Sequence, residues 1–170
     1  MTLELLIEDP RWERLDLAAL ATRGVEAVLR RLDHDPDLCE ISLLACDDAR
    51  IAVLNADFRG KPQPTNVLSW PAEDLAAEEA GGGPLPPEAD PDGSIPLGDI
   101  ALAWETCIRE AGEQGKPPAD HVTHLVVHGV LHLLGYDHVR VADATLMEGL
   151  ETTILGELGL PDPYMVADGP

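Results

Sequence analysis

The residues of this chain that could do chemistry are concentrated in a histidine-rich segment. Five of its six histidines fall between positions 121 and 138: His121, His124, His128, His132 and His138. His128 and His132 lie four residues apart on a pattern that predicts a helix, so their imidazoles project from one face about a turn apart. Gly135 ends that helix and Tyr136-Asp137 turn the chain, which lets His138 return as a third ligand. Three neutral imidazoles with one open side are typical of a catalytic zinc site.

His124 is the alternative third ligand, because it lies on the same helical stripe as His128 and His132. That stripe spans about 12 Å along a straight helix, so a single ion cannot be reached from both of its ends. We therefore predict His138 as the third ligand. For His121 and His124 we expect a place at the surface or beside a ligand.

The spacing H-x3-H-x2-G-x2-H is also that of the metzincin peptidases, in which a glutamate base directly follows the first histidine. This chain has the metal-binding histidines of that spacing, but Gly129 stands where the peptidases have the glutamate base. Metal-assisted hydrolysis is still open, because a bound ion lowers the pKa of water by itself. Met147 could match the metzincin methionine turn, but its helical spacing with Leu150 and Ile154 predicts core packing.

Hydrophobic periodicity predicts the elements that must position these histidines. We expect strands at residues 3–7, 38–46, 67–70 and 97–103, and helices at 14–32, 47–58, 104–114, 119–134 and 143–158. Strands and helices mix without the regular alternation of a doubly wound fold. The prediction is an α+β (mixed α/β) fold: a single compact domain over residues 1–170, with helices packed on a small mixed sheet and a zincin-like metal helix.

Residues 72–92 differ in composition from the rest of the chain. They contain seven acids, no base, three consecutive glycines and four prolines. Such a segment buries little apolar surface, which predicts an exposed, flexible insert within the domain.

Length and composition favour one globular domain, with 170 residues of which 45% are hydrophobic. The formal net charge of −21 argues against a general affinity for polyanions. No stretch approaches the ~18 consecutive apolar residues of a membrane span, and the N-terminus lacks the pattern of a targeting peptide. We therefore expect a cytoplasmic protein without a membrane partner. Buried, reduced thiols are expected for the three cysteines, Cys39, Cys46 and Cys107.

The histidine segment, HGVLHLLGYDH from His128 to His138, resembles the signature of the bacterial YbeY proteins. These are single-strand-directed, metal-dependent endoribonucleases implicated in ribosomal RNA maturation and ribosome quality control. Further blocks support the resemblance, at residues 55–61, 64–71 and 97–100 and at Glu148 and Glu151 of the last predicted helix. Together they cover about residues 51–158. Asn66 and Trp70 depart from the aspartate and phenylalanine that are usual in the family, which bears on substrate choice more than on the metal site.

The resemblance implies that His128, His132 and His138 hold one zinc ion and that Arg59 is catalytic. An arginine beside a metal site can clamp a phosphate through two hydrogen bonds and stabilise charge in phosphoryl transfer. Lys61 is open between a phosphate contact and a solvated lysine, and Asp137 between orienting His138 and stabilising the turn. The implied substrate is single-stranded RNA, ribosomal RNA in particular. The implied partners are a small-subunit ribosomal protein or an assembly GTPase.

Two other functions stay open at this point: a zinc-dependent hydrolase of another substrate, and a non-catalytic ribosome-assembly adaptor. The histidine spacing alone permits the first. An open three-histidine site argues against the second, because structural zinc usually has four protein ligands. The sequence also leaves open whether water or the ribose 2′-hydroxyl attacks. Aromatic residues make up only 4% of the chain, which leaves few platforms for stacking bases.

Overall fold

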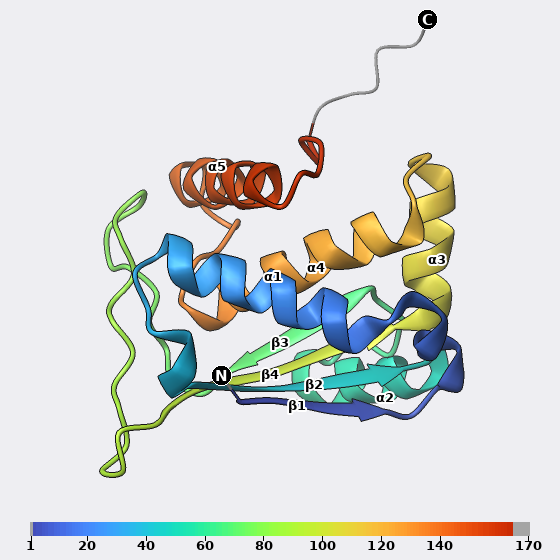
Figure 1. The fold of residues 1–170 in the computed structure, drawn as a ribbon, viewed down its shortest axis with the longest axis horizontal. Helices are drawn as coiled ribbons and strands as arrows, with labels where there is room; N and C mark the ends of the chain where they lie inside the picture. Colours follow the sequence, from blue (N-terminus) through green and yellow to red (C-terminus); the bar gives the residue numbers. More distant parts are fainter. Residues whose placement is uncertain (1, 165–170) are drawn as a thin grey trace, which may run out of the picture.

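A four-stranded sheet in the order β1-β2-β4-β3 forms the centre of the fold (Figure 1). The computed structural model describes residues 2–164, so residues 1 and 165–170 of the predicted domain lie outside the described part. β1, β2 and β4 run parallel, whereas β3 pairs antiparallel with β4 at one edge. The predicted small mixed sheet is confirmed. Its strands are β1 Thr2–Ile7, β2 Cys39–Cys46, β3 Val67–Pro71 and β4 Ile95–Ala103.

Helices cover both faces of this sheet (Figure 1). α1 and α4 lie side by side on one face, α5 packs against them from outside, and α2 covers the opposite face. No helix within residues 2–164 has the length and apolar character needed to cross a membrane. The helices are α1 Leu17–Arg31, α2 Asp48–Arg59, α3 Trp104–Glu113, α4 Pro118–Leu133 and α5 Val141–Glu157.

The two faces of the sheet bury different side chains of the same strands. On β2, Ile41 and Leu43 face the large core beneath α1 and α4, whereas Cys46 faces a smaller core against Ile51 of α2. Side chains of a strand alternate between its faces, so a strand covered on both sides is apolar almost throughout. The continuous apolar run at residues 43–46 of β2 therefore reflects burial on both sides.

The predicted first helix, at residues 14–32, begins too early. A short 3₁₀ helix, Pro10–Leu15, precedes α1 and is separated from it by Asp16, whose φ of 49° is left-handed. Aspartate tolerates this conformation better than most residues, so the break falls there. Trp12 in this short helix is fully buried, and its indole N–H donates to the Cys46 carbonyl at 2.9 Å. The 3₁₀ turn thus anchors the start of α1 to the end of β2.

The acidic insert, residues 72–92, connects β3 to β4 as a long loop at one end of the sheet (Figure 1). Most of its residues are exposed, but Leu75 is buried. The Arg140 guanidinium donates to the carbonyls of Ala77 and Glu78 at 2.8 and 3.0 Å. The insert is therefore attached to the start of α5 by specific hydrogen bonds. Its flexibility stays a prediction.

Candidate metal centre

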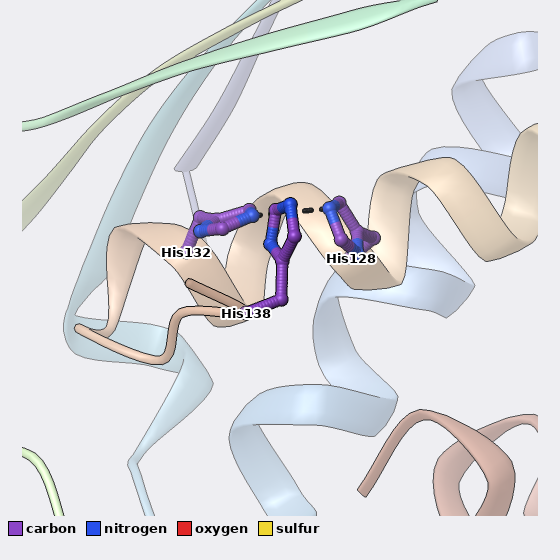
Figure 2. Close-up of side chains that lie close together, drawn as sticks. All are labelled: His128, His132 and His138. Atoms are coloured by element: carbon purple, nitrogen blue, oxygen red, sulfur yellow. Dashed lines mark hydrogen bonds between the residues drawn. The ribbon is translucent and has the colours of Figure 1, made fainter. Parts of the chain in front are cut away.

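Three imidazoles converge at the C-terminal end of α4 (Figure 2). His128 and His132 come from successive turns of α4, and their Nε2 atoms lie 3.0 Å apart. His138 follows the helix and turns its ring toward the other two, with ring centroids 5.4 Å from His128 and 5.1 Å from His132. One ligand nitrogen from each of the three lies within 4.8 Å of the others. The structure thus brings together the three histidines that the spacing singled out.

The turn between α4 and His138 depends on Gly135. Its φ is +100°, a backbone conformation that residues other than glycine rarely adopt. A Cβ built on it would lie 2.7 Å from the Leu75 carbonyl of the acidic insert. Beyond the glycine, the Asp137 carboxylate accepts from the backbone N–H of His138 at 2.7 Å, while the His138 ring nitrogen is 3.7 Å away. Asp137 therefore stabilises the turn.

Glu151 of α5 contacts Nδ1 of His128, the ring nitrogen that does not face His132. Its side chain is fully buried, and its carboxylate lies 2.5 Å from Nδ1 of His128 and 2.8 Å from Nε2 of His124. The Tyr164 hydroxyl donates to the same carboxylate. Burial by itself raises the pKa of Glu151, but the hydrogen bonds to His124 and His128 outweigh it and hold this pKa at about 2. An ionised carboxylate only accepts hydrogen bonds, so Nδ1 of His128 carries the proton of this contact, and Nε2 is the ring nitrogen that is left to bind a metal ion.

The donor set is compatible with a metal ion. The Nε2 atoms of His128 and His132 face each other at 3.0 Å, an arrangement that calls for a shared proton or a cation. Burial, together with the neighbouring His128 and His138, lowers the pKa of His132 to about 4. His132 is therefore neutral near pH 7, as an imidazole ligand must be. Nitrogen donors of this kind suit zinc, copper, iron or nickel.

His124 and His121 lie in a polar network on the far side of His128. His124 contacts Glu151 and so supports a predicted ligand, whereas His121 is buried and lies 3.0 Å from a carboxylate oxygen of Glu110. Glu110 also accepts from the Asn66 amide at 2.9 Å. An aspartate at position 66 would face the Glu110 carboxylate, so asparagine supplies the donor that this contact needs.

A cleft of about 620 Å³ opens beside the three histidines. It runs along β3 and is bounded by the end of α2, the first residues of the acidic insert and the loop that carries His138. Arg59 lines this cleft and is exposed. Within residues 2–164, nothing forms an ion pair or hydrogen bond with its guanidinium. The structure thus places Arg59 in the same cleft as the histidines, and Lys61 is not among the described residues that line it.

Gly129 occupies the position of the metzincin base and faces the sheet. A Cβ there would lie 3.1 Å from Ile100 Cδ1 and 3.3 Å from the Ser69 hydroxyl. The helix therefore packs too closely against β3 and β4 to accommodate a glutamate side chain at this point.

Sequence reasoning gave Glu151 no role at the site and did not single out Tyr164. A signal for Glu151 was present, because it lies on the same helical face as Met147 and Ile154, where an acid is out of place in the core. Tyr164 follows α5 in irregular structure, and nothing in the sequence pattern marks it.

The chain is similar to known proteins over most of its length. The family model described as endoribonuclease YbeY matches residues 7–159. The chain is 68% identical over 164 residues to the endoribonuclease YbeY of Ruegeria pomeroyi, covering 96% of this chain and 98% of that protein. It is 56% identical to that of another Ruegeria strain over the full length of both. A solution structure from Thermotoga maritima shares the fold, with a TM-score of 0.55 at 20% identity over 96% of this chain and 99% of the other. This chain therefore belongs to the YbeY endoribonuclease family.

Proposed function

We propose that this protein is a metal-dependent endoribonuclease that cleaves single-stranded RNA in ribosomal RNA maturation and ribosome quality control. The observation that carries the proposal is the convergence of His128, His132 and His138 in an open cleft that also holds Arg59. Membership of the YbeY family supports RNA as the substrate.

His128, His132 and His138 would hold one zinc ion, since three imidazoles suit zinc and leave one coordination position free. When bound, such an ion supplies Lewis-acid chemistry toward a phosphodiester. Glu151 fixes the proton of His128 on Nδ1, so that Nε2 stays available to the ion. Without this contact the imidazole could take either tautomer, so Glu151 prepares the site before the ion arrives.

Arg59 acts on the substrate. It is the last residue of α2 and is followed by Gly60 in a left-handed conformation, which ends the helix at the rim of the cleft. Its exposed guanidinium can donate two parallel hydrogen bonds to a phosphate and offset the charge that develops during cleavage.

The net charge of −21 bears on how RNA reaches the cleft. Long-range repulsion slows the encounter of two polyanions. We therefore propose that a small-subunit ribosomal protein or an assembly GTPase delivers the RNA. Copurification of either with the tagged chain would support delivery, and full cleavage of isolated RNA at rates unaffected by these proteins would contradict it.

Elemental analysis of the purified protein, free of chelator, tests the metal site. About one zinc per chain is expected, with loss of the metal in a variant that lacks all three histidines. No stoichiometric transition metal in the wild type, even after reconstitution, would contradict the metal-dependent mechanism and favour the assembly adaptor.

Cleavage of single-stranded RNA by the zinc-loaded protein then tests the role of Arg59. Arg59→Glu is expected to reduce cleavage strongly. Arg109→Glu is the matched control, because Arg109 is an exposed arginine of α3 that pairs with Glu113 and does not line the cleft. Equal activity of the two variants would contradict a role for Arg59 in the reaction.

A further inference from the structure

We propose that Phe58 and Trp70 form a subsite that stacks an unpaired nucleobase at the rim of the cleft. This inference rests on the proposed function and adds the part of the substrate that the site recognises. Phe58 and Trp70 both line the cleft that contains the three histidines and Arg59.

Phe58 is the only phenylalanine of the chain, and 64% of it is exposed. Trp12 and Trp104, by contrast, are buried in the core. A phenylalanine left in water forgoes the favourable free energy of burying its ring. Because Phe58 lines the cleft, a ligand bound there can cover the ring and recover this burial.

The Phe58 ring rests against Trp70, with centroids 4.8 Å apart and planes inclined by 64°. At this inclination the two rings meet edge to face rather than stacking face to face, and the exposure of Phe58 leaves much of its side chain accessible to a ligand. Trp70 itself is only partly buried, packed on its inner side against the smaller core beneath α2. The smaller core therefore supports Trp70, Trp70 supports Phe58, and Phe58 stays accessible from the cleft.

Exposure alone does not make a binding site, since single apolar residues are common on protein surfaces. Val53 of α2 and Leu85 of the insert are also well exposed but do not line the cleft, and Val139, which is exposed and does line it, has no aromatic ring. Phe58 differs in its position beside Arg59. A nucleotide carries its base and its phosphate on one sugar, so adjacent side chains for stacking and for phosphate binding match its two ends.

The charges of the cleft favour stacking as a source of affinity. Among its described lining residues, Arg59 is the sole lysine or arginine, whereas Glu73, Asp74 and Asp137 are acidic. Contacts with the phosphate backbone alone would therefore contribute little to RNA binding. Stacking on an aromatic ring needs no positive charge and tolerates any base. It does need a base that is free of its partner strand, so a single strand is the expected ligand.

The test compares Phe58 variants in the zinc-loaded full-length protein, with a short single-stranded RNA as substrate. Phe58→Leu keeps an apolar side chain but removes the ring, and KM is expected to rise at least about fivefold with little change in kcat. Phe58→Tyr restores the ring and should recover most of the loss. Val53→Ala is the control on the same helix. RNA binding should also quench tryptophan fluorescence, and Trp70→Phe should abolish this quench.

Salt dependence separates stacking from charge. Arg59→Ala is expected to reduce the slope of log affinity against log salt by about 0.7, the contribution of one phosphate contact on a single strand. Phe58→Leu should lower the affinity without changing that slope.

An unchanged KM in Phe58→Leu, while the wild type cleaves RNA, would overturn the stacking subsite and leave the proposed function standing. The same applies if Phe58→Tyr is impaired as much as Phe58→Leu. A zinc-loaded wild type that neither cleaves single-stranded RNA nor shows a fluorescence change would instead overturn the proposed function, and the subsite with it.

Discussion

Replacing Glu151 with glutamine is expected to weaken metal binding about 10- to 100-fold. The carboxylate receives three contacts, from His128, His124 and Tyr164. A glutamine keeps one acceptor oxygen but places an NH₂ group, a donor, where the second oxygen was. At least one of the three contacts is therefore lost. A hydrogen bond to a charged group contributes roughly 1.5–3 kcal/mol, and the expected change in affinity corresponds to about 1.4–2.7 kcal/mol.

The assay is competition for zinc between the protein and a chromophoric chelator. Far-UV circular dichroism shows whether the fold is retained. Nitrogen NMR shifts of the imidazoles report the tautomer of His128, which should change from a fixed Nδ1–H form to a mixture. Because these shifts can be measured in metal-free protein, they report how Glu151 positions His128 independently of activity.

Glu148→Gln is the matched control, since Glu148 lies on the same helix but is exposed. It removes one charge from the same region without touching the histidines. A Glu151→Gln variant that binds zinc as tightly as Glu148→Gln, with an unchanged His128 tautomer, would refute the reasoning.

Three further predictions follow from packing and burial. Gly135→Ala should lower the free energy of unfolding by about 1–3 kcal/mol in urea titrations, because it combines a positive φ with a clash against the insert. Gly156→Ala should raise this free energy by about 0.5–1 kcal/mol, because a Cβ at this helical position would meet no atom of residues 2–164 within 4 Å apart from its neighbours in the helix. Arg140→Ala should speed proteolysis within residues 76–82, because it removes two hydrogen bonds to the insert. The cleavage sites are mapped by mass spectrometry, and cleavage at the wild-type rate would contradict the anchoring role of Arg140. Burial raises the pKa of all three cysteine thiols, to about 12 for Cys46, so little thiolate forms near pH 7. Ellman's reagent should therefore react rapidly with the thiols only after guanidinium is added. A prompt reaction in native protein would contradict the burial of Cys39, Cys46 and Cys107.

Local sequence patterns predicted most of the secondary structure. The strands and helices form close to the predicted positions, because their apolar residues repeat with the period of a strand or a helix. The start of α1 was missed, since the left-handed Asp16 is selected by the docking of Trp12 under the end of β2. That contact joins residues far apart in the sequence, and no local period records it.

The sequence by itself determined the three-histidine group. Helical spacing fixes the relative position of His128 and His132, and Gly135 permits the turn that returns His138, so local geometry suffices. Only the tertiary structure decided what surrounds these histidines. Glu151 meets His128 because α5 packs on α4. The cleft exists because the edge strand β3, the end of α2 and the insert meet beside the histidines. These contacts join segments distant in the chain, and their register is set by the packing of the whole core.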